Sequence, residues 1–479
     1  MTRALFRCDA SPALGAGHAM RCLATAETLV WASWDVEFVS AAGTMETAPA
    51  IGRAGIPVRP ATPEKLSDAN LVVFDHYGID AAQEAQMAGD LAVRVAFDDA
   101  PSRLHDVDII LDPTPDRTAA DYCQHVRDDT RVLAGVSYAQ LRRPWRAHRA
   151  AALARRKEVG RARRILISMG ATDPGNATVK VLAALAAAHR DLEVDVVLGA
   201  GAPHGRAVKA AVGERGRLHI DPIDMPRLVA EADIAIGAAG SSCFERACLG
   251  LPSIIVVLAD NQIDLAEAFA RAGAARTVTD ADLREPAALG RIIAALVEDD
   301  EGRSEMAIAC AKLADGRGPL RFLLALAGRR QAGANKLTLR LAETSDRDWL
   351  FALQHEPETR RFAINPQAPS AAEHAAWYER ALETPDRLLA IVECDGVPRG
   401  MVRLDRSAQE KASFEVSIAI MPELHGRGLG SATLSSLRQV VPSADLVAIV
   451  RPENRASRSL FTRAGYCRES ETRYRSRAS

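Results

Sequence analysis

The chain has 479 residues, enough for about three domains of ordinary size. Its 60 lysines and arginines nearly balance its 62 aspartates and glutamates, leaving a formal net charge of −2. Because no overall basic field results, we predict small-molecule chemistry and no nucleic-acid partner, and the sequence leaves the oligomeric state unknown.

The chain shows neither the start of a secretory signal nor an apolar run long enough to cross a bilayer. We therefore expect a cytoplasmic protein with no membrane partner. Its eight cysteines include no CxxC pair, and no histidine spacing completes a zinc set. These patterns predict reduced, mostly buried thiols and no metal.

The first predicted strand, 4–8, leads through a glycine-containing loop into a predicted helix. The loop holds Gly15, Gly17 and His18. Glycines let the backbone approach a ligand and a helix start attracts anions, so we predict a phosphate-sized seat. Met20 stands where a dinucleotide fingerprint needs a third glycine, which argues against nicotinamide binding. An imidazole at a helix start stays largely neutral and can accept a proton, although His18 is equally well an ordinary first-turn residue.

Further apolar segments alternate with helical patterns, as in a parallel sheet. Strands are predicted at 36–40, 71–74, 91–97 and 109–111. Polar residues follow these strands at 75–78, 98–99 and 112–113, where open α/β sheets bind ligands, although for any single turn helix capping by aspartate is the simpler explanation. The arginine-rich segment 142–164 predicts a helical connector with a solvated face.

A second alternating unit repeats this design. Strands are predicted at 165–168, 194–198, 218–220, 234–236 and 254–258. The small and hydroxyl residues of 237–242 precede a helix and suit a diphosphate. Glu245, one turn into that helix, could accept hydrogen bonds from a ribose diol or simply favour the helix dipole.

Two Rossmann-like halves facing a shared cleft form the GT-B architecture. Eight motifs, in order, resemble those of the pseudaminic acid pathway UDP-sugar hydrolases over roughly residues 3–325: Arg7-x-Asp9-x-Ser11, Gly15-x-Gly17-His18, Asp75-His76-Tyr77-Gly78, Phe97-Asp98-Asp99, Tyr138-Ala139-x-Leu141-Arg142, Met169-Gly170-Ala171-Thr172-Asp173, Ser241-Ser242-x-x-Glu245 and Asn261-Gln262. One departure is Ala171, which replaces a glycine and narrows the space beside the phosphates.

The resemblance implies hydrolysis of UDP-2,4-diacetamido-2,4,6-trideoxy-β-L-altropyranose by water, with His18 as the catalytic base. The resemblance also implies that Tyr77 faces the sugar and that most of the other matching residues hold UDP. The implied UDP-sugar-binding residues are Gly15, Gly17, Tyr77, Arg142, Gly170, Thr172, Asp173, Asn176, Ser241, Ser242, Glu245 and Gln262.

After a Gly/Arg-rich bridge at 328–335 the pattern changes, and we place a domain boundary near Gly333. A strand is predicted at 337–341, and the strands predicted at 388–393, 400–404 and 414–420 form an antiparallel meander. The segment 422–430, with His425-Gly426-Arg427-Gly428-Leu429-Gly430, precedes a helix whose amides suit a pyrophosphate.

With strand 446–450, Asn454 and Leu460-Phe461-x-x-Ala464-Gly465-Tyr466, this region resembles the GNAT acetyltransferases over about 337–475. The resemblance implies acetyl-CoA as co-substrate, held by Ile418, Ile420, Arg427, Gly428, Leu429, Gly430 and Asn454. Phe461 replaces the tyrosine that often reprotonates the CoA thiolate. Glu415 is the candidate to relay the amine proton through water.

These patterns predict an α/β chain: a GT-B-like pair of Rossmann-like domains, 1–150 with the catalytic histidine and 151–328 binding UDP, followed by a GNAT domain at 336–479. The expected function is acetylation of a UDP-4-amino-sugar and hydrolysis of the product. The alternatives are a GT-B glycosyltransferase, action on another UDP-amino-sugar, and a GNAT domain that only senses acetyl-CoA.

Overall fold

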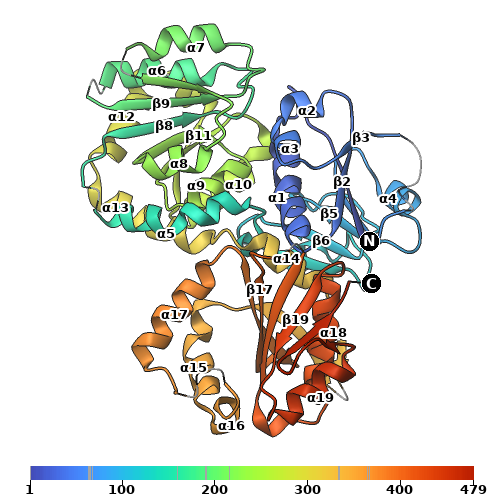
Figure 1. The fold of residues 1–479 in the computed structure, drawn as a ribbon. Coiled ribbons are helices and arrows are strands. Elements are labelled where there is room, and N and C mark those ends of the chain that lie inside the picture. Colours follow the sequence, from blue (N-terminus) through green and yellow to red (C-terminus); the bar gives the residue numbers. More distant parts are fainter. Residues whose placement is uncertain are drawn as a thin grey trace. The chain divides into compact units, whose positions relative to one another are not determined.

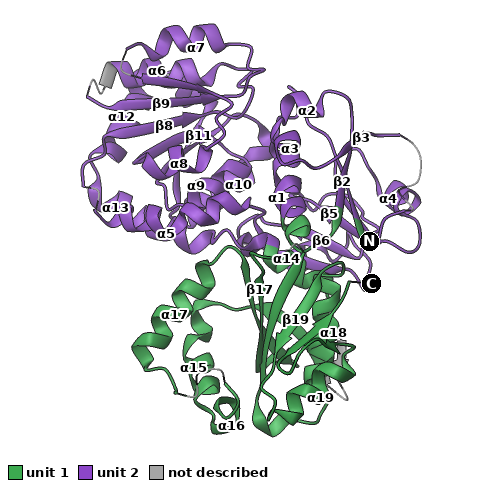
Figure 2. Cartoon of the chain, viewed as in Figure 1, with its two compact units in different colours: residues 1–3, 28–35, 320–479 green, residues 4–27, 36–319 purple. Residues whose placement is uncertain are grey.

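The computed structural model describes residues 2–62, 66, 68–158, 160–188, 191–214, 216–328, 330–332, 335–363, 365, 367–410 and 412–478. The boundary predicted at Gly333 lies outside these residues. The chain forms two compact units, unit 1 with Met1–Arg3, Thr28–Asp35 and Leu320–Ser479, and unit 2 with Ala4–Glu27 and Val36–Pro319 (Figure 2).

Unit 2 contains two sheets (Figure 1). Neighbouring strands whose residue pairs are described run parallel to each other in both sheets. The first has the order β3-β2-β1-β4-β5-β6-β7 and the second β10-β9-β8-β11-β12-β13. In both, the strand order reverses beside the first strand of the sheet, at β1/β4 and β8/β11, where open α/β sheets bind ligands. The predicted pair of Rossmann-like folds is confirmed.

The strands of unit 2 include all of the predicted apolar segments and three that the sequence pattern did not predict, β3, β7 and β13. They are β1 (Arg3–Cys8), β2 (Asp35–Ser40), β3 (Val58–Pro60), β4 (Leu71–Asp75), β5 (Val93–Phe97), β6 (Ile109–Asp112), β7 (Arg131–Ala134), β8 (Arg164–Ser168), β9 (Glu193–Leu198), β10 (Gly216–Ile220), β11 (Ile234–Ala238), β12 (Ser253–Val257) and β13 (Ala275–Thr279).

Helices connect these strands and cover them. They are α1 (Gly17–Trp31), α2 (Thr44–Thr47), α3 (Ala50–Arg53), α4 (Ala81–Ala88), α5 (Arg143–Glu158), α6 (Ala177–Ala188), α7 (Gly205–Val212), α8 (Met225–Glu231), α9 (Ser241–Cys248), α10 (Ile263–Arg271), α11 (Asp280–Leu283), α12 (Pro286–Val297) and α13 (Asp300–Leu313), with short 3₁₀ turns at Ala119–Tyr122, Val136–Tyr138 and Asp260–Gln262. Helix α14 (Gly318–Leu326) begins at the end of unit 2 and belongs to unit 1 from Leu320 on.

Unit 1 is built on a mixed sheet of order β14-β15-β16-β17-β18-β19-β21-β20. Helices α15 and α17 pack on the face that carries Leu389, Ile391 and Met401. The predicted meander is confirmed, because β15 to β18 pair antiparallel in sequence order. The elements are β14 (Arg330–Ala332), β15 (Asn335–Leu341), α15 (Arg347–His355), α16 (Pro357–Arg360), α17 (Ala371–Glu383), β16 (Arg387–Cys394), β17 (Val397–Arg406), β18 (Ser413–Ile420), α18 (Leu429–Val440), β19 (Asp445–Ile449), α19 (Arg455–Arg463), β20 (Cys467–Arg468) and β21 (Arg473–Ser476), with 3₁₀ turns at Thr344–Asp346 and Pro422–Leu424.

Unit 1 also takes in the short segment Thr28–Asp35, which the sequence pattern did not predict. Trp31 is buried, its ring meets Phe414 edge-on at 5.0 Å, and its Nε1 donates to Asp386 at 3.2 Å. Trp34 donates its Nε1–H to the carbonyl of Val440. The core of unit 1 is therefore not made from C-terminal residues alone.

The arginines of α5 serve the interior more than a solvated face. Arg149 donates to the carbonyls of Cys248, Ala311 and Ala314, at the C-terminal ends of α9 and α13. Arg156 donates to carbonyls of Val229 and Ala232 at the end of α8. Because the last carbonyls of a helix lack intrahelical partners, these guanidinium groups stabilise three helix ends. The prediction of a helix is confirmed, and that of a mainly solvated charged face is wrong.

Six of the eight free cysteines are buried, and Cys123 and Cys467 are exposed. Among the described helices, none combines the length and apolarity needed to cross a membrane.

Candidate active site

Four acidic positions gather at the carboxyl edge of the first sheet. Asp9 follows β1, Asp75 ends β4, Asp99 lies just beyond β5, and Asp112 ends β6. Strands β1, β4, β5 and β6 are neighbours in that order, so their carboxyl ends adjoin one another. The predicted concentration of polar groups at this edge is confirmed.

His18 lies in the first turn of α1, directly above this edge. Its Nδ1 is 2.5 Å from Oδ1 of Asp75, whose carboxylate is fully buried. This carboxylate favours the tautomer with the proton on Nδ1, which leaves Nε2 with a lone pair. Within the described residues, no hydrogen bond occupies Nε2. The geometry thus favours the tautomer of His18 that leaves Nε2 free to accept a proton.

Arg21 joins this pair and was missed by the sequence reasoning. It donates from Nε to Oδ2 of Asp75 at 2.6 Å and from Nη1 to Asp99 at 3.1 Å. Residues three apart share one helix face, so the spacing of His18 and Arg21 is the signal that could have found it.

Tyr77 stands beside the histidine ring with nearly half of its surface exposed. The two rings meet edge-on at a centroid distance of 4.9 Å, and the Tyr77 hydroxyl donates to Asp99 at 2.8 Å. Burial raises the pKa of Tyr77 and the charge of Asp99 adds to this effect, so the hydroxyl stays protonated. The exposed Tyr77 ring beside His18 is therefore accessible to a ligand.

The loops of the two halves of unit 2 approach each other at the glycines. Gly15 has a φ of +75°, which side chains other than glycine rarely adopt. A Cβ added to Gly17 would lie 3.7 Å from Oγ of Ser241, and the hydroxyl of Thr172 donates to the carbonyl of Pro12 at 3.3 Å. The structure therefore brings Gly15, Gly17 and His18 next to residues expected to hold UDP.

Helices α6 and α9 follow the two glycine-containing loops of the second half, and their first amides differ in whether a side chain occupies them. Asp173 is buried, and its carboxylate accepts from the backbone N–H groups of Ala177 and Thr178 at the start of α6. The start of α9 follows Gly240, with neither a capping side chain nor an acidic residue in its first turn in the part of the chain that the structure describes. A diphosphate is therefore expected at α9.

Asp173 thus shapes the loop by holding the first amides of α6, and its predicted contact with the nucleotide stays a prediction. Replacing it with alanine removes both hydrogen bonds and should lower the free energy of unfolding by about 1 kcal/mol, the usual effect of losing a helix cap. Thermal unfolding of Asp173→Ala measures this loss. Asp173→Asn, which can still cap, is the matched control, and equal stability of all three proteins would contradict the assignment.

The remaining predicted nucleotide ligands line the same loops. Asn176 has a φ of +52°, and its buried Oδ1 has no hydrogen-bond partner among the described residues. Gly170 has a φ of +92°. Ser242 accepts from Arg246 at 3.0 Å, which leaves its hydroxyl proton to donate, and Gln262 accepts from the N–H of Leu258 at 2.9 Å. These positions fit a nucleotide site.

The carboxyl group of Glu245 is shielded from water, which changes its pKa. Burial raises its pKa to about 7, and the charges of Arg246 and Arg142 and a hydrogen bond from Trp145 offset only part of that rise. Arg142 also binds Glu27 on α1, with Nη2 2.5 Å from Oε1. Arg142 therefore joins the two halves of unit 2 as well as facing Glu245.

This pKa gives a prediction for UDP binding. Ribose hydroxyls donate more strongly to a carboxylate than to a carboxylic acid, so UDP should bind the ionised form better. Below about pH 7 the affinity should fall, by roughly fivefold between about pH 8 and pH 6, the difference between a charged and a neutral hydrogen bond. Calorimetric titration of UDP measures it, with Glu245→Gln as control. A flat profile in the wild type would remove Glu245 from the ribose site.

In unit 1, β18 and β19 pair only at their first residues. The parallel register runs from Ser413↔Asp445 to Glu415↔Val447, while β18 continues to Ile420. The later part of β18, with Ile418 and Ile420, therefore has backbone groups on that side that β19 does not use. Such an open strand edge can bind the amide-containing arm of CoA.

Helix α18 begins beside this opening with an uncapped N-terminus. Gly428 is its N-cap, with a φ of +86°, and no side chain of the described residues caps it. The exposed Arg427 precedes it, and Leu429 buries its side chain while its amide stands at the helix start. Free amides and an exposed guanidinium fit the predicted pyrophosphate site.

Two predicted CoA ligands have structural roles. A Cβ on Gly430 would lie 3.0 Å from the side chain of Leu460, so this glycine lets α18 and α19 pack closely. Asn454 caps α19 by accepting from the N–H of Ser457 at 3.0 Å. His425 ties the loop to β18, with Nε2 2.9 Å from the carbonyl oxygen of Ile420.

The acid–base groups of unit 1 are sparse. Glu415 is exposed on β18 opposite Asp405, and no ion pair or hydrogen bond of its side chain occurs among the described residues. Phe461 is buried against Tyr466, with ring centroids 5.0 Å apart. Glu415 can therefore exchange protons with solvent, whereas position 461 carries no acid.

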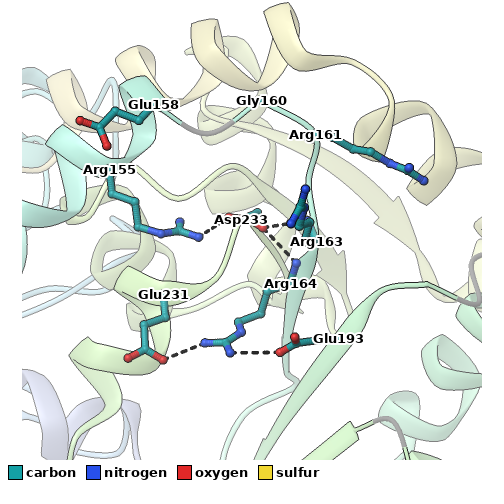
Figure 3. A pocket seen from close by; sticks show the side chains of 9 residues that line it. All are labelled: Arg155, Glu158, Gly160, Arg161, Arg163, Arg164, Glu193, Glu231 and Asp233. Atoms are coloured by element: carbon teal, nitrogen blue, oxygen red, sulfur yellow. Dashed lines mark hydrogen bonds and ion pairs between the residues drawn. The ribbon is translucent and has the colours of Figure 1, made fainter.

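A separate cavity of about 590 Å³ lies at the amino ends of β8, β9 and β11, at the edge opposite the loops (Figure 3). Its charges pair with one another: Arg155 binds Asp233, and Arg164 binds Glu193 and Glu231. Because each cation is matched by a carboxylate, we infer that these ion pairs stabilise the ends of the strands and do not bind a ligand.

Two families match parts of the chain. Residues 168–317 match the glycosyltransferase family 28 C-terminal domain, and residues 336–466 match the acetyltransferase (GNAT) domain. The chain thus joins a domain similar to the family 28 C-terminal domain to a GNAT acetyltransferase domain, as predicted for the C-terminal part.

Individual relatives match shorter stretches. The spore coat polysaccharide biosynthesis protein SpsG of Bacillus subtilis (strain 168) is 30% identical over 155 residues, 32% of this chain and 44% of its own length. An uncharacterised protein of Methanocaldococcus jannaschii is 31% identical over 104 residues, 21% of each chain. The matches thus span less than half of these curated relatives.

Solved structures are similar at lower identity. MurG of Acinetobacter baumannii is 16% identical, covering 67% of this chain and 98% of its own, with a TM-score of 0.48. The ribosomal L7/L12 α-N-protein acetyltransferase RimL, in complex with coenzyme A, is 15% identical, covering 31% of this chain and 98% of its own, with a TM-score of 0.28.

Proposed function

We propose that this chain acetylates the 4-amino group of a UDP-amino-sugar with acetyl-CoA and hydrolyses the resulting UDP-2,4-diacetamido-2,4,6-trideoxy-β-L-altropyranose to UDP and free sugar. The observation that carries the hydrolase half is His18, oriented by Asp75 with Nε2 open, beside the uncapped start of α9. The polysaccharide role in the name of SpsG supports sugar-nucleotide chemistry.

In the hydrolysis, His18 takes a proton from water through Nε2 as the water oxygen bonds to the anomeric carbon. The bond between that carbon and the phosphate oxygen breaks, and UDP leaves with the negative charge. Amides at the start of α9, with the hydroxyls of Ser241 and Ser242, stabilise this charge as it develops. Tyr77 packs against the sugar.

In the acetyl transfer, the sugar amine attacks the thioester carbon of acetyl-CoA and the bond to sulfur breaks. The amine proton passes through water to Glu415, which its exposure permits. The CoA thiolate leaves and takes a proton from solvent, because Phe461 has none to give. When bound, acetyl-CoA supplies the activated acetyl group, and Ile418, Ile420, Gly428 and the amide of Leu429 hold it.

A glycosyltransferase is the second candidate, favoured by the family 28 match over residues 168–317. The two activities differ in whether water or an acceptor alcohol attacks. Incubation of the acetylated UDP-sugar with the protein and no acceptor distinguishes them. We expect UDP to be released, and release that depends on an added alcohol would favour the transferase.

Acetyl-CoA sensing is the alternative for unit 1, and the buried Phe461 is the observation in its favour. A domain that binds CoA by calorimetry but acetylates no amino-sugar would be a sensor. We expect acetylation, because a thiolate can leave without a dedicated acid.

A further inference from the structure

The arrangement around His18 assigns roles beyond the base itself. We infer that Asp75 positions His18 for the hydrolysis, and that Arg21 locks Asp75 in place and ties it to Asp99 and Tyr77. The reaction named here rests on the proposed function, but the arrangement is a property of the folded protein and can be tested without substrate.

The hydrogen bonds of Asp75 leave its carboxylate no freedom to turn. Oδ1 faces Nδ1 of His18 at 2.5 Å and accepts from Nη2 of Arg21 at 2.7 Å. Oδ2 accepts from Nε of Arg21 at 2.6 Å and from the thiol of Cys22 at 3.5 Å. A carboxylate can only accept, so the 2.5 Å approach of Nδ1 to Oδ1 requires a proton on Nδ1 and leaves Nε2 for the substrate; Nη2 of Arg21, itself a donor, lies farther from Nδ1, at 3.3 Å.

Arg21 also connects Asp75 to Tyr77, the residue expected to face the sugar. Its planar guanidinium binds Asp75 through two nitrogens and Asp99 through the third. Asp99 in turn accepts from the Tyr77 hydroxyl. One rigid group therefore sets the distance between the base and the ring beside it, which a flexible lysine cannot do.

The charged and titratable groups that contact His18 are Asp75, Arg21 and Tyr77; Asp99 binds Arg21 and Tyr77, and the Cys22 thiol donates to Asp75. Burial alone would raise the pKa of Asp75, but the charge of Arg21, followed by that of His18, outweighs it and holds the pKa far below its usual range. Asp75 therefore stays ionised and stabilises the imidazolium that forms during catalysis.

The test replaces Asp75 with asparagine. An amide cannot accept at both positions, so it either turns its NH₂ toward Nδ1 of His18 or loses a bond to Arg21. The wild type, labelled with ¹⁵N-histidine, should show Nδ1 of His18 protonated and Nε2 bare, with the signals assigned by their loss in His18→Gln. Asp75→Asn should shift the ring toward the opposite tautomer.

In kinetics, Asp75→Asn should lower kcat for UDP release by roughly tenfold, part of the contribution of a general base, with little change in KM. The acid limb of its pH profile should move to lower pH, because the imidazolium loses its stabilising charge. Arg21→Lys should give an intermediate loss of kcat. Asp80→Asn, which keeps a capping residue at the start of α4, should behave as the wild type.

An Nδ1 that is unprotonated in the wild type would overturn the inference even if the variants fail to fold. The inference would also be overturned if Asp75→Asn kept the wild-type tautomer of His18 and the wild-type acid limb of the pH profile. A wild type with the expected tautomer that releases no UDP would refute the proposed hydrolysis and leave the arrangement standing, so the two failures are distinguishable.

Discussion

Replacing His18 with alanine should slow UDP release from the acetylated UDP-sugar by about a hundredfold or more, the range of a lost general base. The side chain contacts Asp75 and Tyr77 at the surface of the first half, and removing it leaves the loops of the second half untouched. UDP affinity and acetyl transfer should therefore change little. Steady-state UDP release, calorimetry with UDP and an acetylation assay measure the three properties.

The matched control is the variant His148→Ala. In the described structure Nδ1 of His148 contacts the carbonyl of Pro144 on the same helix, α5, and its Nε2 lies 4.0 Å from Asp224. This variant should hydrolyse at the wild-type rate. Hydrolysis by His18→Ala at that rate would end the assignment of the base, whereas a loss of UDP binding would show that the variant disturbs the nucleotide site.

Replacing Gly428 with valine should weaken acetyl-CoA binding by about a hundredfold and leave hydrolysis unchanged. A left-handed backbone costs a side-chain-bearing residue about 1–2 kcal/mol, and losing one hydrogen bond to a charged phosphate costs about 1.5–3 kcal/mol more. No described atom lies within 4 Å of the added Cβ, so the effect comes from the backbone and the ligand and not from crowding inside the protein.

Calorimetry with acetyl-CoA measures this affinity, and UDP release from the acetylated substrate is the internal control. Gly428→Asn separates the two causes, because asparagine tolerates the left-handed region and should retain more affinity than valine. Unchanged CoA binding in Gly428→Val would mean that the pyrophosphate does not meet this turn.

Most strands of the three sheets could be predicted because their signals are local, whereas short strands such as β3 and β20 were missed. An apolar run such as Leu71–Asp75 bounded by turn residues specifies a buried strand wherever it lies. The glycine loops could be predicted for the same reason, since Gly15 and Gly428 both adopt the left-handed backbone that glycine permits.

Other features depend on partners far away in the sequence. Asp173 looks like a phosphate-loop residue until its two amide partners on α6 are seen. Trp31 reads as the end of an amphipathic helix, yet its partners are Phe414 and Asp386. The same holds for Arg149 and Arg156, whose charge predicted a solvated face while their partners are distant helix ends. No local pattern carries this information, because tertiary packing decides which polar group each side chain meets.

The central claim, that one chain both acetylates and hydrolyses, is tested most directly by incubating the whole protein with the UDP-4-amino-sugar and acetyl-CoA and following all products by mass. We expect the acetylated nucleotide sugar as a transient, followed by UDP and the free diacetamido-sugar, with no UDP released when acetyl-CoA is withheld. An acetylated nucleotide sugar that accumulates without UDP release would contradict the hydrolase, and an unmodified amino-sugar would contradict the acetyltransferase.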